Sequence, residues 1–220
     1  MNCDKKKMDG LNINSKILNG IRPAVLSVDI NNLCNLRCKH CFWEANYNDK
    51  TDMNLNILDS VKQVLNRFPS ITNILWYGGE PLINKESVKL LKQGVKLIKN
   101  NLIITNGTFP LPSFNAFYHY VVSMNGIKDM HNYLRGANVY EVIKRNVIEA
   151  IKRNMPIFIL YCINALNIDA IPAFLEEWSN KRLTGIGFTV YTAIQEKYPE
   201  LTLNDKDRER IARLFKRYGR

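Results

Sequence analysis

Short runs of β-branched and aromatic residues alternate with amphipathic stretches from residue 24 onward, and this alternation limits the fold more than any other feature of the chain. Six such runs are candidate strands: residues 24–30, 73–77, 102–105, 118–123, 157–163 and 185–191. Their nearly continuous apolar character is typical of strands that are covered on both faces. Because strands that alternate with helices build a parallel sheet, the pattern predicts an α/β fold.

The intervening stretches carry apolar residues at helical spacing, and each apolar stripe is expected to pack on the sheet. The stripes comprise Leu58, Val61, Leu65 and Phe68; Leu91, Val95 and Ile98; Val139, Ile143, Val147 and Ile151; Ile168, Ile171, Leu175 and Trp178; and Ile211, Leu214, Phe215 and Tyr218. Residues 109–116 contain Pro110 and Pro112 and are too short and too interrupted for a full helix. We therefore expect the third crossover to be irregular.

The length and composition of the chain indicate one folding unit. At 220 residues with 46% hydrophobic residues, the chain suffices for one substantial core and is short for two ordinary domains. We expect a single domain over residues 21–220 after a loosely ordered polar tail at residues 1–20. No stretch approaches the roughly 20 uninterrupted apolar residues of a membrane span, and no apolar run follows Lys5 to Lys7 as in a secretory signal. These features predict a cytoplasmic protein without membrane association.

The net charge of +11 is concentrated at the two ends of the chain, in Lys5 to Lys7 and in residues 204–220. A terminal run of charge is more often a solvated surface than a nucleic-acid footprint. Few aromatic residues are interleaved with these basic ones. Nucleic-acid binding is therefore not predicted from the charge.

Three of the five cysteines, Cys34, Cys38 and Cys41, fall within the run NNLCNLRCKHCF. Thiolates at this spacing can converge on one iron-sulfur cube, but three of them leave one of its four irons open. An incomplete ligand set indicates that a small molecule completes it, as at catalytic zinc sites. A zinc site is the alternative, but the chain has no second CxxC pair, and it has only three histidines.

The clustered cysteines do not resemble a disulfide framework. Cys162, which lies in an apolar run, is predicted to be a buried structural thiol.

Glycine-rich and polar turns follow four consecutive candidate strands. The cysteines follow the first strand, residues 78–81 (Gly-Gly-Glu-Pro) the second, residues 105–107 (Thr-Asn-Gly) the third, and residues 123–126 (Ser-Met-Asn-Gly) the fourth. In barrels and open parallel sheets alike, ligands bind at the carboxyl ends of the strands. The sequence therefore predicts one site on this rim.

These motifs resemble those of radical SAM enzymes, in which CxxxCxxC binds a 4Fe-4S cluster and S-adenosylmethionine chelates the open iron. The resemblance extends from Arg22 to about Gly219 and implies a partial (βα)6 TIM-like barrel that is open on one side. Gly78, Gly79, Glu80 and Pro81 match the GGE motif, which lines the methionine end of the cofactor. Glycines let the backbone approach a ligand closely, and a carboxylate with nearby carbonyl groups suits an ammonium group.

Residues 123–126 and 131–136 are similar to elements of the peptide- and protein-modifying, SPASM-like subgroup, although this chain lacks that subgroup's auxiliary-cluster cysteines. Asn125 and Asn132 stand where relatives commonly have aspartate. The resemblance implies that Ser123 contacts the ribose or carboxylate of S-adenosylmethionine and that Arg135 pairs with the carboxylate, which the planar guanidinium suits. His40 lies where relatives often have an aromatic residue near the adenine. Asn31, Asn106 and Asn164 are further candidate contacts with the cofactor or substrate; alternatively, these amides only close turns.

The resemblance implies an enzyme that accepts an electron from a donor such as flavodoxin or ferredoxin and cleaves S-adenosylmethionine reductively. The resulting 5'-deoxyadenosyl radical would abstract a hydrogen atom from a substrate, which the sequence does not identify and which peptide-modifying relatives suggest is a peptide or protein. An iron-sulfur electron carrier, an RNA-modifying radical SAM enzyme and a zinc-containing RNA-binding module are the alternatives. Either the chain needs no auxiliary cluster or it lacks a C-terminal portion.

Overall fold

The computed structural model describes residues 22–41, 56–192 and 197–218, and it shows one sheet of six parallel strands in the order β1-β2-β3-β4-β5-β6. The strands are β1 (Val25–Asp29), β2 (Asn73–Tyr77), β3 (Asn100–Thr105), β4 (His119–Met124), β5 (Ile157–Ile163) and β6 (Gly185–Val190). Each observed strand overlaps its predicted run. The α/β prediction is confirmed, while the predicted tail at residues 1–20 lies outside the described residues.

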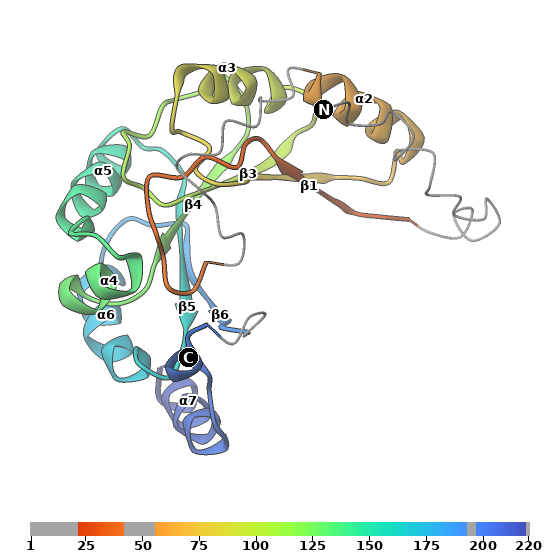
Figure 1. Cartoon of the computed structure of the whole chain (residues 1–220). Coiled ribbons are helices and arrows are strands. Elements are labelled where there is room, and N and C mark those ends of the chain that lie inside the picture. The colour runs from red at the N-terminus through yellow and green to blue at the C-terminus, as the bar shows by residue number, and fades with distance from the viewer. Residues whose placement is uncertain (1–21, 42–55, 193–196, 219–220) are drawn as a thin grey trace, which may run out of the picture.

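The sheet curves into an arc with its helices on the outer, convex side, and β1 and β6 form the two ends of the arc (Figure 1). The helices are α2 (Ile57–Arg67), α3 (Lys85–Gly94), α4 (Lys128–Arg135), α5 (Tyr140–Lys152), α6 (Ile171–Trp178) and α7 (Asp205–Tyr218), with the 3-10 turns η2 (Ile168–Ala170) and η3 (Pro199–Leu201). As predicted, the described chain between β3 and β4 contains no helix. This arrangement is a partial barrel whose concave face is open on one side.

Two helices differ from the sequence-based expectation. The stripe that ran to Ile98 predicts a longer α3, yet this helix ends at Gly94. A Cβ atom at Gly94 would lie 2.4 Å from the Trp76 ring, so the chain there packs directly on the sheet. The Asn101 side chain then donates hydrogen bonds to the carbonyl groups of Val95 and Ile98 (both 2.9 Å), which ends the helical pattern. The apolar stripes do not predict helix α4, which ends at Arg135 and is capped by Gly136, whose φ of 68° is the left-handed conformation that favours glycine.

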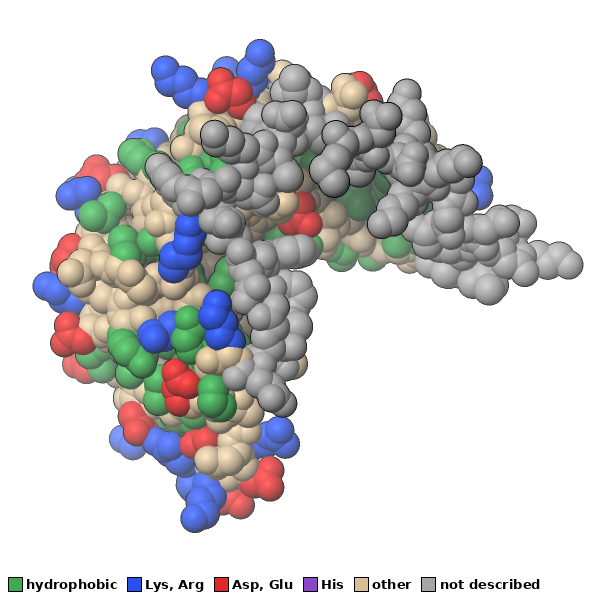
Figure 2. Space-filling view, in the orientation of Figure 1, with side chains coloured by type: hydrophobic (Ala, Val, Ile, Leu, Met, Phe, Trp, Pro, Cys, Tyr) green, Lys and Arg blue, Asp and Glu red, His purple; other side chains and the backbone are tan. Residues whose placement is uncertain are grey.

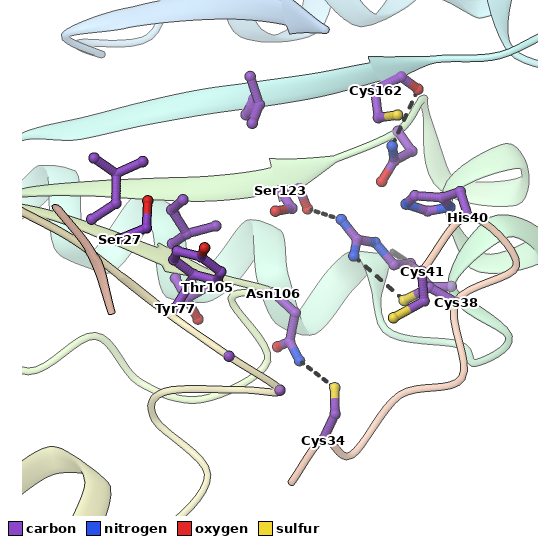
Figure 3. A pocket seen from close by; sticks show the side chains of 17 residues that line it. Ser27, Cys34, Cys38, His40, Cys41, Tyr77, Thr105, Asn106, Ser123 and Cys162 are labelled. Atoms are coloured by element: carbon purple, nitrogen blue, oxygen red, sulfur yellow. Dashed lines mark hydrogen bonds between the residues drawn. The ribbon is translucent and has the colours of Figure 1, made fainter. Parts of the chain in front are cut away.

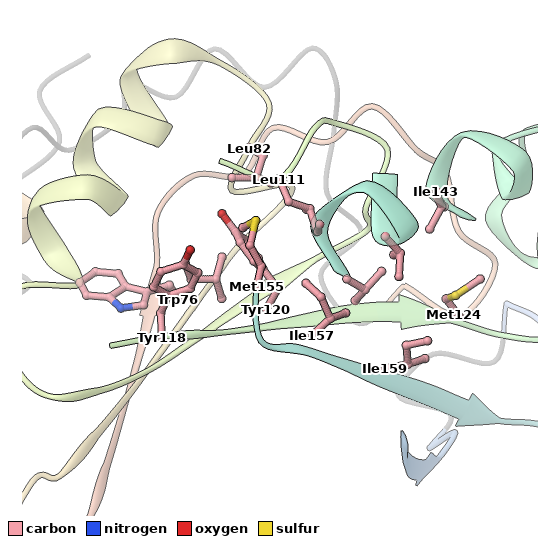
Figure 4. Packing of buried hydrophobic residues seen from close by; sticks show 14 of the residues in the cluster. Trp76, Leu82, Leu111, Tyr118, Tyr120, Met124, Ile143, Met155, Ile157 and Ile159 are labelled. Carbon is pink, nitrogen blue, oxygen red and sulfur yellow. The ribbon is translucent and has the colours of Figure 1, made fainter. Parts of the chain in front are cut away.

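The core lies between the convex face of the sheet and the helices (Figure 4). Alternate residues of each strand point into it, as in β5, where Ile157, Ile159, Tyr161 and Ile163 are buried and the residues between them are less so. The largest fully buried side chains are Trp76, Trp178, Tyr120, Tyr140, Tyr161 and Phe174. Packing on one face of each strand leaves the opposite side chains on the concave face, where they are available to a site.

On the surface, lysine and arginine side chains are interspersed with acidic ones rather than gathered into one patch on the face that Figure 2 shows. On α7, Arg208 pairs with Asp205, Arg210 with Asp207, and Arg213 with Glu209. Among the described residues, no helix has the length and apolar composition needed to cross a membrane.

Candidate functional site

A cavity of about 460 Å³ lies at the carboxyl ends of the strands, on the concave face of the sheet (Figure 3). The strands contribute Ser27, Leu75, Ile104, Ser123, Leu160 and Cys162 to its lining, and the loop after β1 contributes Cys34, Cys38, His40 and Cys41. The structure therefore brings the three motif cysteines to one cavity, on the rim that the sequence predicts.

The turn after β2 holds the loop that carries the cysteines, residues 31–41. The backbone N–H of Gly79 donates to the carbonyl of Asn31 (2.7 Å), and that of Glu80 donates to the carbonyl of Leu33 (2.6 Å). A Cβ atom would lie 2.3 Å from the Asn31 oxygen if placed at Gly78, and 2.0 Å from the Leu33 oxygen if placed at Gly79. Both glycines line the cavity. Glycine is required at these positions because the backbone of the cysteine loop lies too close to leave room for a Cβ atom.

Glu80 is fully buried, and its carboxylate is bonded to the protein itself. One oxygen accepts hydrogen bonds from the backbone of Leu82 (3.0 Å) and the hydroxyl of Thr105 (2.7 Å), and the other accepts from the backbone of Asn106 (2.7 Å). Burial raises the pKa of this carboxyl, and the three hydrogen bonds oppose that rise. Neither Glu80 nor Pro81 lines the cavity. In place of the expected contact with a ligand's ammonium group, the Glu80 side chain joins the ends of β2 and β3.

Two asparagine side chains join the same network. Asn106 lines the cavity, and its amide donates to the Asn35 side chain (3.0 Å) and lies 3.9 Å from the sulfur of Cys34, a contact drawn in Figure 3. Asn31 donates to the Ser87 hydroxyl (2.9 Å) and accepts from the backbone of Leu33 (2.9 Å). Asn31 therefore shapes the cysteine loop, and Asn106 is placed to contact both the loop and a bound ligand.

The C-terminal end of α4 holds the cysteine loop from a second side. The backbone N–H of Lys39 donates to the carbonyl of Leu134 (2.9 Å). A Cβ atom at Gly136 would lie 2.8 Å from the carbonyl oxygen of Arg37. The Lys39 ammonium group lies over the rings of Tyr133 and Tyr198, 4.6 and 5.0 Å from their centroids, in a cation–π arrangement. Residues 37–39 are thus fixed against α4.

Arg135 extends from the last turn of α4 into the cavity. Its guanidinium donates to the backbone carbonyl of Ser123 (2.6 Å) and to the sulfur of Cys38 (3.5 Å), while its Nε has no hydrogen-bond partner. Among the described residues that line the cavity, it has the one charged side chain. The Ser123 side chain also lines the cavity. These two candidates therefore lie together beside the cysteines.

His40 lines the cavity near Cys162 (Figure 3), and Asn125, whose amide donates to the Cys162 carbonyl, lines it as well. Burial, and secondarily the positive charge of Arg135, lowers the pKa of His40 to about 3, so its imidazole is neutral near pH 7. The His40 Nδ1 and the Asn125 Oδ1 are buried without hydrogen-bond partners in the structure. Asn125, which stands where relatives commonly have aspartate, donates its backbone N–H to the buried His131 (3.2 Å).

Cys162 lines the cavity, which corrects the expectation of a thiol buried for structural reasons alone. Its carbonyl accepts hydrogen bonds from the side chains of Asn167 (2.9 Å) and Asn125 (3.3 Å), and burial raises the pKa of its thiol to about 11. The alternation of β5 could have revealed this position, because Cys162 lies on the face opposite the core residues. Asn164 does not line the cavity, and its side chain accepts from the backbone of Leu166 (3.1 Å), which closes a turn.

The cavity residues fit an iron-sulfur cluster with a small polar ligand. In the described part of the chain, no three Cys, His, Asp or Glu side chains lie close enough together to bind a single metal ion. A cluster does not require its ligands to lie that close together, because each thiolate binds a different iron. The partnerless polar atoms of His40, Asn125 and Arg135 offer donors and acceptors to a ligand. A cavity of about 460 Å³ falls in the usual range for small-molecule sites.

Comparisons with known proteins find related sequences and similar structures. The family model described as Radical SAM superfamily matches residues 28–177. The chain is 24% identical over 169 residues to pre-heme d1 synthase of Dinoroseobacter shibae, covering 73% of this chain and 42% of that protein. It spans less than half of the length of the curated relatives that it matches.

The fold is similar to two solved structures. One is SuiB of Streptococcus suis bound to S-adenosylmethionine, with a TM-score of 0.75 and 17% identity over 89% of this chain and 47% of that one. The other is anSMEcpe with bound AdoMet and the Cp18Cys peptide, with a TM-score of 0.68 and 23% identity over 88% of this chain and 58% of that one. A further structure of SuiB contains its precursor peptide SuiA. These likenesses confirm the predicted partial barrel.

Proposed function

The chain belongs to the radical SAM superfamily, and from this premise we propose that it is an enzyme that binds a 4Fe-4S cluster and S-adenosylmethionine in the cavity at the strand ends. Cys34, Cys38 and Cys41 would hold the cluster through three of its irons. When bound together, the two groups supply a 5'-deoxyadenosyl radical that abstracts a hydrogen atom from the substrate. A flavodoxin or ferredoxin would provide the electron.

The residues of this chain would bind and orient S-adenosylmethionine. The backbone of Gly78 and Gly79 borders the cavity without a side chain in the way. Arg135, whose Nε has no partner, would donate to the carboxylate, next to the side chains of Ser123 and Asn106. The neutral His40 and the Asn125 amide would meet polar atoms at the other end of the ligand. The apolar side chains of Leu75, Ile104 and Leu160 would exclude water.

One observation carries the proposal: three cysteines of one short loop line a cavity together with a buried arginine and polar atoms that lack partners. The test is anaerobic reconstitution with iron and sulfide, followed by reduction with dithionite in the presence of S-adenosylmethionine. We expect about four irons per chain and the formation of 5'-deoxyadenosine, with neither in the Cys38→Ala variant. An intact cluster without that product would contradict the enzyme proposal and favour the electron carrier.

We further propose a peptide or protein as the substrate, with RNA as the second candidate. The support is the similarity of the fold to SuiB, which has been solved with a precursor peptide, and to anSMEcpe, which has been solved with a bound peptide. The test is whether unmodified peptides or tRNA raise the rate of 5'-deoxyadenosine formation, with mass spectrometry of the added polymer. A mass change in the peptide alone would support the proposal, and a change in the RNA alone would contradict it. A cytoplasmic location remains a prediction.

A further inference from the structure

Arg135 contacts the protein at two points that together fix its guanidinium beside a cluster cysteine. On the basis of the proposed cluster, we infer that Arg135 is a positioning residue that holds Cys38 and raises the reduction potential of the cluster. This role is additional to the pairing with the carboxylate of S-adenosylmethionine. It concerns the cluster by itself, so it can be measured when no S-adenosylmethionine is present.

The geometry gives the guanidinium little freedom. One nitrogen donates to the carbonyl of Ser123 at the end of β4 (2.6 Å), and a second donates to the sulfur of Cys38 (3.5 Å). Figure 3 draws both contacts as dashed lines that end at the labelled Ser123 and Cys38. Arg135 is 5% exposed. The backbone on both sides is held as well, because Lys39 bonds to the carbonyl of Leu134 and Gly136 packs on the carbonyl of Arg37. The position of Cys38 is therefore set by the end of α4.

The positive charge of Arg135 lies next to the group that the electron would reduce, the proposed cluster. Three thiolates and the cluster form an anionic group, and reduction adds one more negative charge to it. A buried cation in contact with a cluster ligand stabilises the reduced state more than the oxidised state, because charges interact strongly away from bulk water. Net charge and hydrogen bonds to the sulfurs are among the factors that set cluster potentials. Removing Arg135 should therefore lower the potential.

The neighbouring cation Lys39 does not duplicate this role. Lys39 directly follows Cys38 in the chain, yet its ammonium group lies over the rings of Tyr133 and Tyr198, and Lys39 does not line the cavity. Arg153 offers a matched control away from the site. Its guanidinium donates to the carbonyl of Leu111 (2.7 Å), much as Arg135 donates to that of Ser123.

The experiment is a potentiometric titration of the reconstituted protein, followed by electron paramagnetic resonance of the reduced cluster without S-adenosylmethionine. Wild type is compared with Arg135→Gln and Arg153→Gln, and the iron content is measured in each. At the wild-type midpoint potential we expect the ratio of reduced to oxidised cluster to fall about tenfold in Arg135→Gln, which is a shift of about 59 mV for one electron. Arg153→Gln should match wild type.

An unchanged midpoint in an Arg135→Gln protein with full iron content would overturn the inference. If Arg135→Gln does not retain iron, Arg135→Lys and Arg135→Met decide the question. Iron restored by lysine alone supports a cationic donor at Cys38. Iron restored equally by Arg135→Met, in a protein with a wild-type circular dichroism spectrum, would show that the side chain only fills space and would contradict the inference. None of these results depends on 5'-deoxyadenosine formation, so failure of the proposed function is a separate outcome.

Discussion

The carboxylate of Glu80 accepts a hydrogen bond from the backbone N–H of Asn106 (2.7 Å), although the two residues are 26 positions apart in the chain. This bond joins the turn after β2 to the turn after β3, and both turns contact the cysteine loop. A single buried carboxylate therefore fixes the relative position of two walls of the cavity and of the loop between them.

Replacing Glu80 with glutamine should destabilise the protein. The glutamine amide can accept at one end only, so its NH2 group would face one of the three donors that now surround the carboxylate. A buried donor without an acceptor costs roughly 1–3 kcal/mol, and we expect a loss of that size in the free energy of unfolding, measured by urea denaturation. Thr105→Ser keeps the hydroxyl that donates to the carboxylate and accepts from the backbone of Gly107 (3.1 Å), so its loss should be smaller. Equal stability of wild type and Glu80→Gln would contradict this role.

Alanine at Cys34, Cys38 or Cys41 should abolish the bound iron after reconstitution, because each thiolate is expected to hold a different iron. Cys162 lines the same cavity and provides the discriminating variant. If three thiolates suffice, Cys162→Ala retains about four irons per chain, as measured colorimetrically. Loss of iron in Cys162→Ala would identify a fourth protein ligand and would leave no open iron for S-adenosylmethionine.

Gly79→Ala should displace the cysteine loop. The added Cβ would lie 2.0 Å from the carbonyl oxygen of Leu33, a backbone atom that moves only with the loop. Overpacking of this kind costs roughly 1–3 kcal/mol, and we expect lower thermal stability together with reduced iron content. Gly185→Ala is the control, because its Cβ would meet the Phe158 ring at 2.9 Å and a side chain can turn aside. Normal iron binding by Gly79→Ala would show that the close approach is not required.

The stability of the protein should depend on pH through Glu177. Partial burial alone would raise the pKa of this carboxyl, but hydrogen bonds from Lys144 and Tyr140 lower it below its ordinary 4.5. A carboxyl with a lowered pKa stabilises the fold above pH 4.5, and this contribution is lost as the pH falls through the folded-state pKa. We therefore expect Glu177→Gln to be less stable than wild type at pH 7 in urea denaturation, and the difference to shrink below pH 4.5.

The exposed Glu176, on the same helix, serves as the control for that measurement. Glu176→Gln should leave the pH dependence as it is in wild type. A Glu177→Gln difference that stays constant from pH 7 to pH 4 would contradict the role given to the ionised carboxylate.

Local patterns predicted most of the sheet and the place of the site. The strand of residues 157–163 was predicted from its apolar run, and the structure has the same boundaries. The cysteines and the turn at residues 78–81 were assigned to the rim because the carboxyl ends of parallel strands meet there, and the structure brings them together. These features could be predicted because each depends on a few consecutive residues.

The rest depends on partners that are distant in the sequence. Helix α3 ends early where Gly94 packs on Trp76 and Asn101 binds the carbonyl groups of Val95 and Ile98, contacts that no local pattern contains. The sequence predicts that the carboxylate of Glu80 contacts a ligand, but in the structure this carboxylate accepts hydrogen bonds from Thr105 and Asn106. The apolar run of residues 157–163 predicts a buried structural thiol at Cys162, whereas only every second residue of that run faces the helices.

The attachment of residues 31–41 to both the β2–β3 side and the end of α4 has a thermodynamic consequence for metal uptake. The entropy lost in ordering this segment is incurred when the chain folds, before any iron arrives. Cluster insertion should then require little rearrangement of the polypeptide, so the metal-free and metal-loaded proteins should protect the same amide hydrogens from exchange in this segment.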